Sequence, residues 1–322
     1  MVSLPITMVI NMTGYLLQSR RTLLKQLALM SVASTFPYTA FSKFKPALIT
    51  RPIPSSGQRL PVIGMGTHIT FNVGNDPQAR LNRTEVLRTF FDMGGQVVDS
   101  SPMYGSAEAV LGFCINRLGK SASPLFSATK VWTSDTEDGK EQIADSQRLW
   151  GLDQFSLNQV HNLVNWRSHL DTLLQMKADG HLQYVGITTS HGRRHRELEK
   201  IMQSQPIDFV QLTYHINNQD VEQRLLPLAL EKGIAVIINR PFSKGGLFDE
   251  YQRYPLPDWT MEFDCSNWAQ FFLKFVVSHP AVTCAIPATS RIDHMIENMG
   301  AGYGRLPDSG MRQRMISYVQ SL

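Results

Sequence analysis

The stretch Gln96-Val97-Val98-Asp99-Ser100-Ser101-Pro102-Met103-Tyr104 joins a short apolar run to an acid and a phenol that follow it closely. Two similar runs come later, Leu125-Phe126-Ser127-Ala128 and Leu157-Asn158-Gln159-Val160, and they lead to Lys130 and His161. The runs recur at intervals of roughly thirty residues with helical patterns between them, which is typical of successive β/α units. Because the strand ends of a parallel barrel meet at one mouth, we expect an acid, a phenol, an amine and an imidazole to share one pocket.

Eight strand patterns alternate with eight helical patterns, and this count predicts a (β/α)8 TIM barrel of the α/β class. Strands are expected at residues 62–66, 96–99, 125–130, 155–161, 183–188, 208–213, 235–239 and 283–287. Helices are expected at residues 83–93, 106–118, 140–150, 167–178, 194–202, 221–231, 266–277 and 291–299, and a final helical pattern covers 307–322. Residues 51–60 hold turn formers between short apolar flanks, which predicts an N-terminal β-hairpin that plugs the barrel bottom.

Length and composition favour one large domain, which we place at residues 44–322. The chain has 322 residues, of which 43% are hydrophobic and 18% charged, so it can bury a substantial core. Barrels of this class commonly span roughly 200–400 residues as one unit. The net charge of +4 is modest and the basic residues are dispersed, so nucleic-acid binding has little support.

Residues 1–43 have the composition of a targeting segment. The basic run Ser19-Arg20-Arg21-Thr22-Leu23-Leu24-Lys25 precedes an apolar stretch at 27–36 that is too short to cross a bilayer as a helix. This pattern resembles a twin-arginine signal, which implies the Tat export machinery as a partner, a periplasmic location and no stable membrane span in the mature protein. The alternative is a basic amphipathic helix before the domain, in which case the protein stays in the cytoplasm.

Four motifs resemble those of the aldo-keto reductase family over about residues 48–302. The motifs cover residues 98–108, 127–130, 159–161 and 286–290. An aspartate five residues before a tyrosine is weak evidence alone, but its coincidence with a strand-end lysine and histidine in barrel order is specific. The resemblance implies reduction of aldehydes and ketones to alcohols by hydride transfer from a nicotinamide dinucleotide.

The catalytic residues implied are Asp99, Tyr104, Lys130 and His161, and their side chains suit that chemistry. Tyr104 is the expected general acid, and a neighbouring ammonium should lower its pKa from about 10 by favouring the phenolate. Lys130 would supply that charge, held in place by Asp99. His161 would donate a hydrogen bond to the substrate carbonyl as a neutral ring, in a tautomer that the sequence does not reveal.

The resemblance also implies a cofactor site, which we expect to hold NADPH, with NADH as the alternative. The cofactor-binding residues expected are Thr67, Thr188, Thr189, Gln211, Asn239, Arg240, Pro241, Phe242, Lys244, Thr289, Ser290, Arg291, His294, Glu297 and Asn298. Two positions depart from the family's common pattern. Thr188-Thr189 replaces Ser-Asn at the carboxamide, and Asn239 replaces a stacking aromatic, so either Arg240 covers the nicotinamide or that contact is missing.

Loop positions after the first, third and fourth strands predict an aromatic-lined substrate pocket for a small carbonyl compound. The residues expected there are His68, Trp132, Asn162 and Trp166, although either tryptophan is as well explained by simple packing. We expect no metal among the site residues.

Two other functions are compatible with parts of the pattern. A non-catalytic barrel that binds nucleotide, senses redox state and regulates a partner has no need of all four reacting groups. A barrel hydrolase or aldolase with a Schiff base on Lys130 leaves Tyr104 and His161 without roles.

Overall fold

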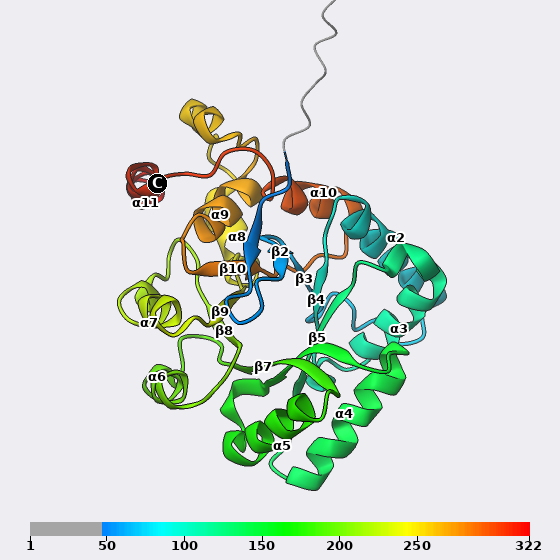
Figure 1. Ribbon diagram of the computed structural model, residues 1–322. Helices are drawn as coiled ribbons and strands as arrows, with labels where there is room; N and C mark the ends of the chain where they lie inside the picture. The colour runs from blue at the N-terminus through cyan, green and yellow to red at the C-terminus, as the bar shows by residue number, and fades with distance from the viewer. Residues whose placement is uncertain (1–46) are drawn as a thin grey trace, which may run out of the picture. The chain divides into compact units, whose positions relative to one another are not determined.

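Eight parallel strands form a barrel in the order in which they occur along the chain (Figure 1). The computed structural model describes residues 47–322, and the predicted leader, residues 1–43, lies outside them. The strands are β3 (Met65–Gly66), β4 (Val97–Asp99), β5 (Phe126–Val131), β6 (Phe155–Val160), β7 (Leu182–Thr188), β8 (Phe209–Thr213), β9 (Ala235–Asn239) and β10 (Val282–Ala285). A parallel bridge between Ile63 and Ala285, and a 3.0 Å bond from the Gly66 amide to the Pro287 carbonyl, join the first and last strands. The predicted barrel is therefore confirmed.

The helices surround the barrel on its outer side or lie at one of its ends. They are α2 (Pro77–Asp92), α3 (Ala107–Leu118), α4 (Thr136–Trp150), α5 (Trp166–Ala178), α6 (His195–Ser204), α7 (Leu225–Lys232), α8 (Gly246–Tyr251), α9 (Trp268–Val277), α10 (Ile292–Gly300) and α11 (Ser309–Gln320). Helix α2 begins before the predicted residue 83 because Asp76 caps it, accepting from the Ala79 amide at 2.9 Å. Short α8 was not predicted.

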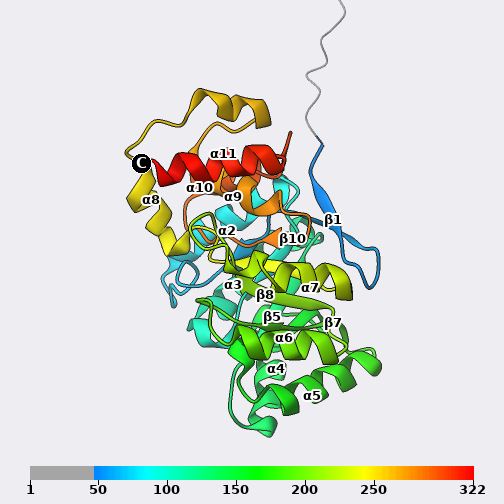
Figure 2. The same cartoon turned by 90° about the vertical axis from the view of Figure 1, so that its left-hand side faces the viewer.

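A β-hairpin closes one end of the barrel, as predicted. Strands β1 (Thr50–Pro52) and β2 (Arg59–Pro61) pair antiparallel, and Ile53 and Leu60 pack into the cluster that fills the barrel interior. The Tyr184 hydroxyl binds the turn between them through Ser56 Oγ at 2.7 Å. Figure 2 shows the hairpin and α8 at opposite ends of the barrel. The open mouth therefore lies at the carboxyl ends of the strands, where barrel enzymes carry their active sites.

Across residues 47–322, no helix is both long and apolar enough to cross a membrane. The same part of the chain contains no group of three or more histidine, cysteine or acidic side chains placed to bind a metal.

Candidate active site

The four predicted catalytic side chains meet at the mouth of the barrel. Asp99 ends β4, Lys130 lies near the end of β5, and His161 follows β6 directly. Tyr104 ends a 3-10 turn at Pro102–Tyr104, and the Lys130 Nζ lies 5.2 Å from the centre of the Tyr104 ring. The Tyr104 and His161 rings are 5.9 Å apart in an edge-to-face arrangement.

A short loop between β4 and α3 brings Tyr104 over the strand ends. The Ser101 side chain caps the 3-10 turn, and Gly105 ends it at φ 62°, a conformation that favours glycine. An added Cβ at Gly105 would lie 2.5 Å from Asn72 Oδ1. The loop therefore needs glycine at this position for both its backbone and its packing.

Lys130 is completely buried and forms an ion pair with Asp99. Its Nζ donates to Asp99 Oδ1 at 2.5 Å and to the Ser100 carbonyl at 2.7 Å. The other Asp99 oxygen accepts from Gln159 at 3.1 Å and from Gln211 at 2.9 Å. Burial disfavours the ammonium, but the nearby carboxylate and the Tyr104 hydroxyl outweigh it, so the pKa of Lys130 is raised. Lys130 is thus a fixed positive charge.

The pKa of Tyr104 differs from the sequence-based expectation. Burial, which disfavours the phenolate, raises this pKa above its ordinary value, while the charge of Lys130 acts in the predicted downward direction. Asp99 opposes Lys130 because it lies in the same ion pair. The expected net lowering is therefore wrong for the protein alone, and Tyr104 holds its proton firmly.

His161 is neutral, and its ring orientation is fixed by Ser101. Burial, and then the charge of Lys130, lower the pKa of His161 to about 2. The His161 Nδ1 and the Ser101 Oγ are 2.9 Å apart, and both residues are buried. Ser101 Oγ accepts from the Met103 amide at 3.4 Å, so its own hydrogen is free for Nδ1. A Ser101 hydroxyl that donates to Nδ1 leaves the ring hydrogen on Nε2.

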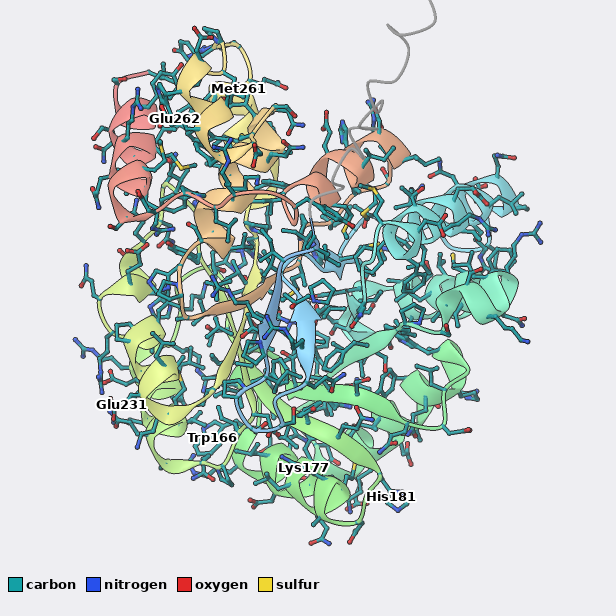
Figure 3. All side chains as sticks on the ribbon, turned by 45° about the horizontal axis from the view of Figure 1, so that its top comes forward. Trp166, Lys177, His181, Glu231, Met261 and Glu262 are labelled. Atoms are coloured by element: carbon teal, nitrogen blue, oxygen red, sulfur yellow. The ribbon has the colours of Figure 1, made fainter. Side chains whose placement is uncertain are left out.

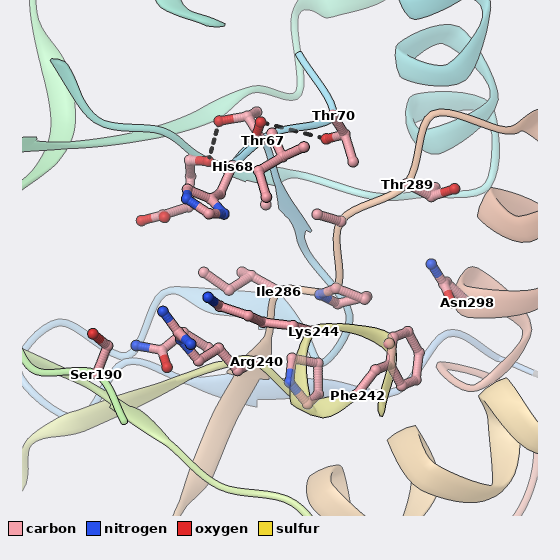
Figure 4. Close-up of a pocket in the computed structure, with 18 of the residues that line it drawn as sticks. Thr67, His68, Thr70, Ser190, Arg240, Phe242, Lys244, Ile286, Thr289 and Asn298 are labelled. Carbon is pink, nitrogen blue, oxygen red and sulfur yellow. Dashed lines mark hydrogen bonds between the residues drawn. The ribbon is translucent and has the colours of Figure 1, made fainter. Parts of the chain in front are cut away.

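One cavity of about 740 Å³ lies at this mouth, and most of the predicted site residues line it (Figure 4). The catalytic residues that reach it are Asp99, Tyr104 and His161. The predicted binding residues that line it are Thr67, His68, Asn162, Thr188, Thr189, Gln211, Asn239, Arg240, Pro241, Phe242, Lys244, Thr289, His294, Glu297 and Asn298. Lys130 lies beneath its surface.

Four predicted binding residues do not line the cavity. Trp166 packs against the outer core and donates from Nε1 to Glu197 at 2.9 Å, near the periphery of the molecule in Figure 3. Trp132 is 41% exposed, with its ring 6.5 Å from that of His161. The Arg291 guanidinium pairs with Asp293 outside the cavity. Ser290 is half-buried and also lies outside.

Several lining residues were missed by the sequence interpretation. They are Ile69, Thr70, Met103, Ser190, His191, Phe248, Gln252, Asn267 and Trp268. Ser190 and His191 directly follow Thr189, so their position after β7 was a usable signal. Phe248 belongs to α8, which was not predicted, whereas Trp268 begins α9, a predicted helix that was not connected with the pocket.

The cavity has features that fit a nicotinamide dinucleotide. The Thr189 Oγ1 is buried at the cavity wall without a hydrogen-bond partner, so it can bind a polar ligand group there. At the middle of the cavity Lys244 is exposed, and Gly245 has φ 99°, which leaves the backbone of this loop open to a phosphate. Asn298 lines the far end.

Asn239 cannot stack on a ligand, because its amide is occupied by hydrogen bonds at the carboxyl ends of β7 and β8. Its Nδ2 donates to the Thr189 carbonyl at 2.9 Å, and its Oδ1 accepts from Thr213 Oγ1 at 2.6 Å. The next residue, Arg240, is the one whose side chain enters the cavity (Figure 4).

The loop after β6 is held by the loop after β7. Asn162 and Leu163 have φ values of 53° and 56°, which are rare for residues with side chains. Arg194 Nη1 donates to the carbonyls of both residues at 2.9 Å, and Thr188 Oγ1 accepts from the Asn162 amide at 3.0 Å. This clamp fixes the segment that carries His161.

Comparison with known proteins agrees with this geometry. A family model described as "Aldo/keto reductase family" matches residues 62–314. Methylglyoxal reductase YeaE of Escherichia coli (strain K12) is 24% identical, and the match covers 74% of this chain and 84% of the relative. Aldo-keto reductase str7 of Strobilurus tenacellus is 23% identical, with 70% and 78% covered.

Solved structures show the same fold. The holo form of an aldo-keto reductase from Bacillus halodurans has a TM-score of 0.70 and 20% identity, covering 85% of this chain and 96% of that one. An aldo-keto reductase from Klebsiella pneumoniae, solved in complex with NADPH, has a TM-score of 0.70 and 20% identity, covering 84% and 96%.

Proposed function

Since this chain belongs to the aldo/keto reductase family, we propose that this oxidoreductase reduces aldehydes or ketones to alcohols with NADPH. The observation that carries the proposal is the meeting of Tyr104, Lys130 and His161 at one cavity wall. The free Thr189 hydroxyl and the exposed Lys244 support a dinucleotide in the same cavity. The NADPH complex of the Klebsiella pneumoniae relative supports the choice of cofactor.

Tyr104 serves as the general acid in this proposal. The bound cofactor supplies the hydride that the carbonyl carbon accepts. As negative charge grows on the carbonyl oxygen, the Tyr104 hydroxyl transfers its proton there, and solvent restores the proton afterwards. The raised pKa of Tyr104 keeps its hydroxyl protonated at neutral pH. The buried Lys130 ammonium stabilises the phenolate that forms.

His161 orients the carbonyl by donating from Nε2. In this proposal the Ser101 hydroxyl donates to Nδ1, 2.9 Å away, so the ring presents a hydrogen rather than a lone pair to the cavity. Ser101 is therefore a positioning residue that acts through His161.

Replacing Ser101 by alanine should lower kcat about tenfold, the equivalent of ~1.4 kcal/mol for one lost hydrogen bond. The affinity for NADPH should stay the same, and Ser101→Thr should restore most of the activity because it keeps the hydroxyl. Nitrogen-15 NMR of His161 provides the direct measurement. A ring that keeps its hydrogen on Nε2 in Ser101→Ala would show that Ser101 does not set the tautomer.

The geometry disfavours the two alternative functions. A Schiff-base enzyme needs a lysine that reaches its substrate as a free amine, whereas Lys130 is fully buried, charged and bound to Asp99. Borohydride treatment with substrate should therefore leave no adduct on Lys130. A redox-sensing barrel needs no positioned Tyr104 and His161 beside its nucleotide.

Fluorescence titration with NADPH and NADH, followed by turnover of a simple aldehyde, tests the proposal. We expect tighter binding of NADPH and oxidation of one cofactor for each alcohol formed. Binding without turnover across a broad set of aldehydes would favour the sensor.

We also propose that residues 1–43 direct export to the periplasm by the twin-arginine route, ahead of a reductase domain at 44–322. Support comes from the Arg20-Arg21 pair and the short apolar stretch after it. Replacing both arginines by lysine should retain the protein in the cytoplasm, as measured by cell fractionation. Export of the variant at the normal level would reject this assignment.

A further inference from the structure

Two positive side chains face the cavity without an acidic partner. Arg240 and Lys244 line the cavity, together with the acids Asp99 and Glu297. Asp99 is already bound to Lys130. Between residues 47 and 322, the side chains of Arg240 and Lys244 form neither an ion pair nor a hydrogen bond. Unused guanidinium donors in a cavity are suited to bind an anion.

Arg240 lies at the reacting end of the cavity rather than at the adenosine end. Figure 4 shows it beside Ser190 and across from His68, with Thr289 and Asn298 at the opposite end. The His68 ring is 4.9 Å from that of Tyr104, so Arg240 faces the wall that carries the proton donor.

The charge of Arg240 affects the pKa of a group at this end of the cavity. Burial, and then Arg240, lower the pKa of His68. Burial also lowers the pKa of Arg240; the Tyr104 phenol acts in the opposite direction, and the charge of Arg193 adds to the lowering. Binding an anion would relieve this repulsion. In the proposed function Lys244 and its open loop would hold the phosphates of the dinucleotide, and Arg240 would stay available for another ligand.

The backbone holds Arg240 in a defined position. Its φ is 52°, and the preceding Asn239 is fixed by hydrogen bonds to Thr213 at the end of β8 and to the Thr189 carbonyl just after β7.

Ile69 and Met103, next in sequence to His68 and Tyr104, are 69% and 40% exposed and line the same cavity. The cavity therefore offers two apolar side chains close to the proton donor as well as the guanidinium.

We propose that Arg240 is a specificity-determining residue that selects carbonyl substrates carrying a carboxylate. The guanidinium pairs with the carboxylate, the side chains of Ile69 and Met103 contact the hydrocarbon part, and the carbonyl points to Tyr104. A planar guanidinium can pair with a carboxylate through two parallel hydrogen bonds. This inference rests on the proposed reductase activity and names its substrate class.

The test compares two matched pairs of aldehydes, 3- and 4-formylbenzoate and their methyl esters, which differ in charge at nearly the same shape. For the wild type, we expect a higher kcat/KM for an acid than for its ester. In Arg240→Gln, the acid-to-ester ratio should fall about 10- to 100-fold, as expected for one charge-assisted hydrogen-bonded pair. Arg240→Lys should keep part of the preference, and added salt should weaken the preference in the wild type and in Arg240→Lys but not in Arg240→Gln.

Binding measurements separate the possible outcomes. Calorimetry without NADPH should show that the wild type binds the acid more tightly than the ester. Arg240→Gln should bind the two equally. This readout does not depend on turnover of any aldehyde. NADPH titration is the control, in which Lys244→Gln is the variant expected to weaken binding of the cofactor. If the wild type shows the same kcat/KM and the same affinity for the acid as for its ester, the proposal is overturned. A loss of NADPH affinity in Arg240→Gln, with the acid-to-ester ratio unchanged, overturns it as well and assigns Arg240 to the cofactor.

Discussion

Replacing Tyr104 by phenylalanine is expected to lower kcat for carbonyl reduction by about 10²- to 10⁴-fold, the range of a lost general acid. Phenylalanine keeps the ring between His68 and His161, whose centres lie 4.9 and 5.9 Å away. The cavity wall therefore keeps its shape, and NADPH should bind with unchanged affinity. Stopped-flow measurement of hydride transfer, together with a fluorescence titration, separates the chemical step from binding.

The pH dependence supplies a second readout for Tyr104. Because burial raises the pKa of Tyr104, reduction by the wild type should decline only at a pH above the ordinary phenol pKa of about 10, where the phenol ionises. The decline should be absent from the residual activity of Tyr104→Phe. Turnover near the wild-type level in that variant would remove Tyr104 as the proton donor and leave water or His161 in that role.

The sequence predicted the barrel well because each strand ends in a recognisable way. Short apolar runs with polar residues at their carboxyl ends recur from β4 to β9, and that rhythm depends on local pattern alone. The positions of Asp99 and Lys130 followed from it, since parallel strands in register bring their ends together. Helix α8 was not predicted because its six residues are too few to show a periodic pattern.

The finer features of the site depend on contacts that no local pattern encodes. Ser101 meets His161 across sixty residues, and its role depends on the orientation of both side chains. The pKa of Tyr104 reflects a balance between burial and two opposite charges, so the presence of a lysine did not decide its direction. Likewise, Trp166 faces the outer core because Glu197 binds its indole, although its place after β6 suggested the pocket.

Replacing Lys130 by methionine should have the largest combined effect on activity and stability. The change leaves the Asp99 carboxylate in the barrel without its cation, although Gln159 and Gln211 still donate to it. Removing one member of a buried ion pair typically costs about 3–5 kcal/mol in the free energy of unfolding. Reduction should also be lost, because no positive charge remains to stabilise the phenolate of Tyr104.

Comparison with a double variant distinguishes the two effects. Lys130→Met combined with Asp99→Asn removes both charges, so it should recover much of the unfolding free energy, as measured by urea denaturation, without recovering turnover. Stability that stays equally low in the double variant would show that the packing of the lysine chain, rather than the unpaired carboxylate, causes the loss. Recovered turnover would contradict the electrostatic role directly, because an apolar side chain at residue 130 cannot favour a negative charge on Tyr104.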